Sequence, residues 1–258
     1  MKIESDVLKF RIIAAQVRKA GLTAFLAVVL CSVSVTRTYA RSLPFFCTEA
    51  GTVLDYERRY VSDGKLKWLH RMTMLEVDRI DSLHTAVRYE SDFRRPGGKR
   101  LYGGPVRLRV EISDGNVNMN LAETLGAVLH NMFPKAALKS DGGITVLPAG
   151  LKPGDVLPDA HSTAHLLGMT YTVSVTERRV LRTETLETPA GRFGCVVVAE
   201  HKEEHAPVYN RSTTAYTWYC PGYGMIRHDT YDGDMRLQTT EQLVSVGRTD
   251  DLQTNGIR

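Results

Sequence analysis

The sequence predicts an all-β protein: a large curved antiparallel meander, half-barrel or sandwich-like, with one short helical insertion. Residues 171–176 alternate apolar and polar side chains, as a strand with one buried face does, and a second strand follows through Arg182 and Glu184. Pro189-Ala190-Gly191 then reverses the chain into a more apolar strand. Similar strands and turns recur at a spacing of about 8 to 14 residues along the chain. A parallel sheet would need helices between its strands, and these are absent from the pattern.

The first half of this meander begins after an N-terminal arm, 42–50. Asp63-Gly64 and Asp114-Gly115 fit the tight turns that join antiparallel strands. Apolar residues spaced by three and four predict one helix at about 121–133, which Pro134 interrupts. We expect it to pack on the sheet, and a lid over a cavity is the alternative. The expected strands are 52–61, 66–77, 83–93, 101–112, 117–119 and 144–147.

The second half follows a connection rich in Pro and Gly at 148–158, which we interpret as a link within one domain, 41–247. Alternation is more regular here than in the first half. The expected strands are 165–177, 179–187, 192–204, 209–220, 223–231 and 235–246. The polar tail 248–258 is expected to be disordered.

Residues 1–40 have the layout of a cleaved secretory signal peptide. Basic residues precede an apolar run, 20–35, and the small residue Ala40 marks a cleavage point. The run is shorter than the roughly 18 to 20 residues of a spanning helix, although an uncleaved anchor is the alternative. A start codon at Val17 would give a leader of more ordinary length. We therefore expect a protein exported to the periplasm or the cell surface, with membrane contact only through this signal.

The charge of the mature chain argues against nucleic acid as a partner. Residues 1–40 hold six of the 33 Lys and Arg residues and two of the 29 Asp and Glu residues, so 27 of each sign remain. A neutral chain with interspersed charges lacks the basic surface that phosphate backbones require. The densest basic run, 94–100, is interpreted as a solvated turn.

Three cysteines remain in the mature chain: Cys47, Cys195 and Cys220. A turn centred at 207 or 208 would place Cys195 opposite Cys220 on neighbouring strands. A disulfide between them needs close and well-registered Cβ atoms. The sequence leaves open whether this pair is oxidised or whether all three are buried, inert thiols.

Histidines supply the sharpest case for a metal. His161 and His165, like His201 and His205, are four residues apart, which on a helix would put both on one face. The second pair lies on a predicted strand, where residues four apart are roughly 13 Å apart, and the first in a loop entering one. We therefore expect exposed histidines and no bound metal.

Other candidate clusters also indicate no catalytic, metal or cofactor site. The aspartates around Gly233 lack the pattern of a calcium loop and fit a hairpin turn instead. Cys220 and His228 could lie near each other, but no third residue orients them. Glu203 and Glu204 would point to opposite faces of a strand, which makes them poor acid and base partners.

Aromatic residues crowd the last strands. Tyr216 and Trp218 would share one face of the sheet, and Tyr219 would lie on the other. Packing and cross-strand pairing are the expected role, and lining a groove for a partner or an apolar ligand is the alternative. The whole set is Tyr209, Tyr216, Trp218, Tyr219, Tyr223 and Tyr231.

The chain resembles a family of exported bacterial proteins, the TapB-like proteins, and its relatives among domains of unknown function. The motifs that carry the resemblance run in order from about residue 50 to 246: 51–56, 147–148, 151–159, 188–195, 218–219 and 222–226. The family tends to carry a Cys before the Asp-Gly turn, where this chain ends its strand with Glu111-Ile112-Ser113. The resemblance implies a signal peptide and a large curved antiparallel sheet. It implies no catalytic residues.

Our hypothesis from sequence is an exported, non-enzymatic binding or assembly module of the periplasm or cell surface, with an envelope protein as partner. The rival is a carrier that holds a lipid or other apolar ligand in the concave face of the sheet, beneath the helix at 121–133. A metal-dependent or hydrolytic enzyme is the third reading. The sequence does not identify the ligand, the partner or the oligomeric state.

Overall fold

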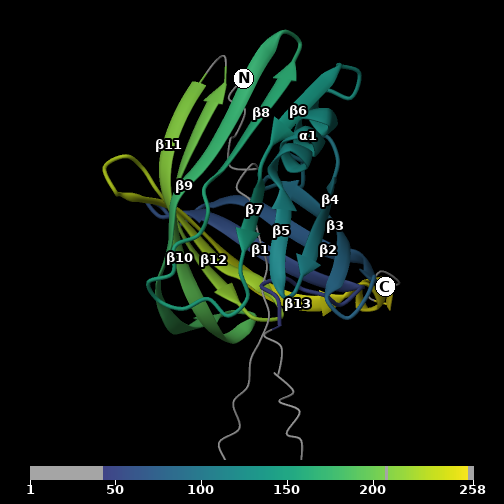
Figure 1. The fold of residues 1–258 in the computed structure, drawn as a ribbon, viewed down its shortest axis with the longest axis vertical. Helices are drawn as coiled ribbons and strands as arrows, with labels where there is room; N and C mark the ends of the chain where they lie inside the picture. Colours follow the sequence, from purple (N-terminus) through teal and green to yellow (C-terminus); the bar gives the residue numbers. More distant parts are fainter. Residues whose placement is uncertain (1–42, 207–208, 255–258) are drawn as a thin grey trace, which may run out of the picture.

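The chain folds into one curved antiparallel sheet of 13 strands that nearly closes into a barrel, which confirms the predicted fold class (Figure 1). The structure is a computed structural model and describes residues 43–206 and 209–254. Its elements are β1 (Thr52–Tyr60), β2 (Leu66–Arg79), β3 (His84–Arg94), β4 (Val106–Ser113), β5 (Asn116–Asn120), α1 (Leu121–Met132), β6 (Leu138–Gly142), β7 (Ile144–Leu147), β8 (Ala160–Leu166), β9 (Met169–Thr188), β10 (Gly191–Ala206), β11 (Tyr209–Cys220), β12 (Gly224–Tyr231), β13 (Leu237–Arg248) and α2 (Thr249–Thr254).

Most neighbours in the sheet are also neighbours in the sequence. The order is β6-β8-β9-β10-β11-β12-β13-β1-β2-β3-β4-β5-β7. One meander therefore runs from β8 to β13 and another from β1 to β5. The pairing of β1 with β13 joins the two and brings the beginning and the end of the described chain together.

A single segment, Leu138–Leu147, forms the seam of this near-barrel. Its first half, β6, pairs with β8 at one edge, and its second half, β7, pairs with β5 at the other. Only Gly143 separates the two, and its N–H donates to the carbonyl of His161 at 2.8 Å. The two edges of the sheet are thus linked through ten consecutive residues.

The inner face of the sheet carries the apolar core. Leu54 and Tyr56 on β1 and Met72 on β2 lie on this face, and all three are at most 1 % exposed. The arm before β1 adds Phe46, whose ring contacts Tyr89 edge-on with centroids 5.1 Å apart. The N-terminal arm therefore helps to fill the interior.

Helix α1 begins and ends where its sequence requires. The side chain of Asn120 accepts the N–H of Glu123 and donates to its carboxylate, a reciprocal cap. The helix ends at Met132 because Pro134 disfavours helical geometry at Phe133. Its buried face packs against β4, β6 and β8. Neither helix in the described ranges is long and apolar enough to cross a membrane.

Two strands were missing from the sequence prediction. β8 lies where a loop entering a strand at 165 was expected. The turn that ends it, Leu167-Gly168, has positive φ at both residues (52° and 75°), and because leucine rarely adopts positive φ the sequence does not indicate a turn there. β6 replaces the expected ragged helix end, because the chain leaves the helix before Pro134 and pairs with β8.

Three boundaries also differ from the prediction. β9 is one strand of 20 residues rather than two, because Glu177 (φ 52°) is accommodated within it as a bulge. β4 starts at Val106, since Gly103-Gly104-Pro105 forms a loop. Residues 249–254 of the expected disordered tail form α2, with Asp250 and Asp251 favourably placed in its first turn.

Candidate functional site

A network of charged groups lies buried on the inner face, where β1 pairs with β13. The register places Arg58 opposite Glu241, and their side chains, both 0 % exposed, form an ion pair at 3.3 Å. Arg58 also donates to Thr239 at 2.9 Å and to Thr230, and its guanidinium lies 4.9 Å from the ring of Trp68. Burial lowers the pKa of Arg58 to about 10.

His70 extends this network toward β3. Its Nδ1 lies 3.3 Å from the carboxylate of Glu241, and its Nε2 lies 3.3 Å from Ser91 Oγ. The order of carboxylate, imidazole and hydroxyl is that of nucleophilic hydrolases. However, the His70 ring is stacked between Tyr56 and Phe93, and Ser91 is 5 % exposed. Because both side chains are buried and the imidazole is held between two rings, we interpret this arrangement as part of the core.

A second set of buried charges comes from β9 and β10. Lys202 pairs with Glu204 on β10, and burial lowers the pKa of this lysine. Arg178 lies 3.5 Å from Glu200 and donates to the carbonyls of Val146 (3.2 Å) and Pro158 (3.0 Å). Its guanidinium therefore joins β7 to the segment before β8.

These charges decide what the interior can hold. An apolar ligand would have to displace these packed side chains, and a buried ion that loses its partner costs several kcal/mol. A cavity of about 270 Å³ does lie beside the first turn of α1, but Arg88, Arg107 and Arg109 are among its lining residues. The geometry therefore does not favour a lipid carrier.

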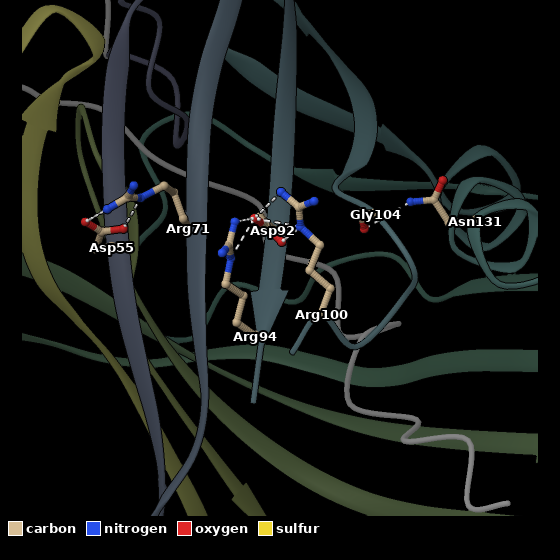
Figure 2. Close-up of polar contacts among 7 residues, drawn as sticks. All are labelled: Asp55, Arg71, Asp92, Arg94, Arg100, Gly104 and Asn131. Atoms are coloured by element: carbon tan, nitrogen blue, oxygen red, sulfur yellow. Dashed lines mark hydrogen bonds and ion pairs between the residues drawn. The ribbon is translucent and has the colours of Figure 1, made fainter. Parts of the chain in front are cut away.

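The outer face of β1–β3 carries ion pairs of the ordinary exposed kind (Figure 2). Arg71 donates to Asp55 at 2.7 and 3.0 Å. Asp92 accepts from Arg94 at 2.7 Å and from Arg100 at 3.0 Å, so one carboxylate holds both ends of the basic loop. Partial burial raises the pKa of Asp92, but these two arginines bring it below its ordinary value.

Figure 2 also shows how the end of α1 is fixed. The side-chain amide of Asn131 donates to the carbonyls of Gly104 (3.3 Å) and Pro105 (2.7 Å). The loop before β4 is thereby tied to the helix.

The histidine pairs lie on strands β8 and β10. His161 and His165 are exposed on β8, and each contacts a hydroxyl of β9, at Ser174 and Thr170. His201 and His205 flank Glu203 at 3.9 Å on each side. Across residues 43–206 and 209–254, no group of three or more His, Cys, Asp or Glu side chains could hold a metal ion.

The other candidate clusters from the sequence do not form sites: the paired residues lie on opposite faces of the sheet, and the aspartates stabilise a turn. Cys220 and His228 lie on opposite faces, because His228 pairs with Thr217 and bonds its hydroxyl at 2.9 Å. Glu203 is exposed and Glu204 buried, as expected for neighbours on a strand. Asp232 accepts the backbone N–H groups of Asp234 and Arg236, which closes the turn before β13.

The aromatic face predicted from the sequence exists and is framed by charges. Tyr216 and Tyr231 lie with ring centroids 5.0 Å apart. The ring of Trp218 lies between the guanidinium groups of Arg182 and Arg227, at 5.9 and 5.0 Å, and its indole N–H donates to Glu184. Tyr219 faces the opposite side, as its strand position requires.

A hollow in the surface lies beside this face, and we call it the β9 groove. Its volume is about 700 Å³, and its walls come from the N-terminal arm, the loop at 150–152, β9, β10 and the turn after β11. It is lined by Phe45, Gly150, Leu151, Lys152, Thr183, Glu184, Thr185, Gly194, Cys195, Val196 and Pro221. A hollow of this size with an apolar lining and a few polar groups has the features of a binding site.

Glycines keep the β9 groove open. A Cβ at Gly194 would meet no atom within 4 Å, so the space above this residue is empty. Gly150 has φ 65°, which lets the loop after β7 turn away from β9. A larger side chain at Gly194 would fill the groove without a backbone penalty.

The titratable groups of the β9 groove are poorly suited to catalysis. Hydrogen bonds from Arg182 and Trp218 lower the pKa of Glu184, which makes its carboxylate a weak base. A hydrogen bond with the Cys220 thiol, together with burial, raises the pKa of Cys195. A nucleophilic cysteine requires the opposite shift.

The predicted register of the two cysteines is correct. Val196 pairs with Tyr219, so Cys195 lies opposite Cys220 on the same face. Both cysteines are free and buried in this structure, as is Cys47. The sequence did not reveal that this pair borders a groove.

Comparison with known proteins places the chain in a family. A family model described as DUF3108-like matches residues 49–243. This agrees with the relatives among domains of unknown function that the motifs indicated, while the TapB-like assignment stays a prediction. No curated protein matches the chain.

Two solved structures share the fold. One is a presumed exported protein with a YmcC-like fold from Bacteroides fragilis (23 % identity, TM-score 0.65, 80 % of this chain and 100 % of that one covered). The other is a presumed lipoprotein from Parabacteroides distasonis (20 % identity, TM-score 0.66, 80 % and 99 % covered). At these identities the likeness shows the fold alone.

Proposed function

The chain belongs to the DUF3108-like family, and from that premise we propose that it is an exported, non-enzymatic module that binds an envelope partner in the β9 groove. The observation that carries the proposal is the groove itself, about 700 Å³ with an open glycine floor at Gly194. It offers apolar contact from Phe45, Leu151 and Val196, and polar groups at its rim.

Export is supported by two independent observations. Residues 1–40 have the composition of a secretory leader. The two solved structures of the same fold are described as an exported protein and a lipoprotein. Both observations favour a location outside the cytoplasm.

A binding role accounts for the site better than the two rivals do. The carrier hypothesis needs an apolar interior, whereas this interior holds the ion pairs Arg58–Glu241 and Lys202–Glu204. The enzyme hypothesis needs an activated group, whereas the carboxylate and thiol of the groove have pKa values shifted away from reactivity.

The test is photo-crosslinking in the native envelope. A photoreactive residue at Lys152, on the rim of the groove, should crosslink a partner, and the same residue at Asp234, in the distant turn before β13, should not. Gly194→Leu fills the groove and should abolish the product. Gly233→Leu is the matched control, because a Cβ there also meets open space.

The proposal is wrong if position 152 gives no product, if position 234 gives the same one, or if Gly194→Leu leaves the product unchanged. Melting temperatures of both leucine variants establish that each is folded.

A further inference from the structure

The β9 groove runs along an open edge of the sheet. β8 pairs with the first part of β9, up to Val175, and the segment before β8 bonds to Arg178 and Val180. Within the described part of the chain, no backbone group bonds to the outer edge of β9 between 181 and 188. The loop at 150–152 stands across the groove from this edge instead of pairing with it.

The register shows which backbone groups point into the open space. Thr188 and Gly191 close the two-residue turn at Pro189-Ala190, which makes them a hydrogen-bonded pair. Pairs alternate from there, so Glu184 bonds to β10, and Thr183, Thr185 and Glu187 direct their N–H and C=O groups outward.

The far end of the strand agrees with this assignment. Val180 donates to the carbonyl of Asp155 and accepts from Gly154, both at 2.8 Å, so its groups point outward. The register shift between Val197 and Val198 inserts one extra residue into β9 between Val180 and Arg182. The backbone groups of β9 that point outward therefore belong to even-numbered residues at Val180 and to odd-numbered residues from Thr183 onward.

We propose that the occupant of the β9 groove is an extended peptide segment of another protein, which adds to the sheet as a strand along Thr183–Glu187. This inference rests on the proposed function and specifies its ligand. Unpaired strand edges are templates for such addition, with main-chain hydrogen bonds for affinity and pockets for alternate side chains.

The walls of the groove indicate the chemistry of that segment. An added strand would lie about 4.8 Å from β9, and every second side chain would face the apolar lining formed by Phe45, Leu151 and Val196. Lys152 has no ion pair among the described residues, so an acidic side chain near it would be complementary.

The same walls select against other occupants. A second copy of this chain would bring its own sheet alongside β9, and the loop at 150–152 occupies that side. An acyl chain would cover the outward N–H groups of Thr183 and Thr185 without bonding them, which is costly for buried groups.

The experiment uses peptides selected from a random linear library on the full mature chain, with binding measured by fluorescence anisotropy. Thr183→Pro and Thr185→Pro remove outward N–H groups that β9–β10 pairing does not use, and proline is tolerated on such edges. Each should weaken binding at least about tenfold. Thr185→Ser keeps the N–H and should bind as the wild type does.

A second readout does not depend on the proline variants being folded. In the wild-type protein, bound peptide should slow hydrogen exchange of the Thr183 and Thr185 amides at least about tenfold, and should leave Glu184, already bonded to β10, unchanged.

The outcomes separate this inference from the proposed function. If Gly194→Leu abolishes peptide binding while both proline variants bind normally and the amides stay unprotected, strand addition is wrong and groove binding stands. If the library yields no binding peptide but position 152 still crosslinks a partner, strand addition is likewise wrong and groove binding stands. A dimer by light scattering that Thr185→Pro dissolves would instead identify a second copy as the occupant.

Discussion

Arg58–Glu241 and Asp92–Arg94 are ion pairs of the same chemistry on opposite faces of the sheet. In the first, both side chains are fully buried, and in the second, the arginine is 45 % exposed. Breaking a buried pair leaves one charge without water or partner, whereas an exposed charge regains its hydration. We therefore expect the inner pair to be needed for the stable pairing of β1 with β13, and the outer pair to contribute little to the free energy of unfolding.

The largest expected effect comes from breaking the inner pair. Arg58→Met removes the cation and leaves Glu241 buried, so the free energy of unfolding should fall by about 3–5 kcal/mol. Urea denaturation followed by circular dichroism measures this loss.

A double variant sharpens the interpretation. Arg58→Met with Glu241→Leu removes both charges, and it should recover most of the loss because no unpaired ion remains. Equal destabilisation by the single and the double variant would show that packing around Trp68, and not charge, is responsible.

An intermediate effect is expected on acidification. The pKa of Glu184 is lowered from 4.5 and that of Asp92 from 3.8. A carboxylate with a lower pKa in the folded chain stabilises it above the unfolded pKa, and this contribution is lost as the pH falls through the folded value. The melting temperature should therefore decline below about pH 4.5, with a shallower decline in Glu184→Gln. An unchanged slope in that variant would contradict the assignment.

The smallest effect should come from the outer pair. Asp92→Asn removes the carboxylate that holds Arg94 and Arg100, and both arginines remain hydrated. Unfolding should become easier by no more than about 1 kcal/mol. A loss as large as that of Arg58→Met would remove the distinction between the two faces.

The fold class was predictable because its signals are local. Asp63-Gly64 and Pro189-Ala190-Gly191 are residues typical of tight turns, and the alternation of apolar and polar side chains indicates the strands. The turn at Leu167-Gly168 was missed because a leucine at positive φ is rare, and no sequence pattern announces it.

The candidate site was less predictable, because it depends on contacts between distant segments. Strand parity could have found Arg58, since it shares a face with Leu54 and Tyr56. Nothing local shows that Leu151, Thr183 and Gly194 meet around one groove. The alternation of strands predicts which face a residue takes, but not which loop covers it.

The pairing of β1 with β13 has a consequence for how the chain acquires its structure. Asp55 lies opposite Ser245, so strands from the two ends of the sequence must find each other. Contacts of such separation slow folding, because a long loop must close before they contribute. During synthesis, β1 is made first and can pair with β13 only after the strands between them have been made. The sheet is therefore completed late, because β1 lacks this neighbour until β13 has been made.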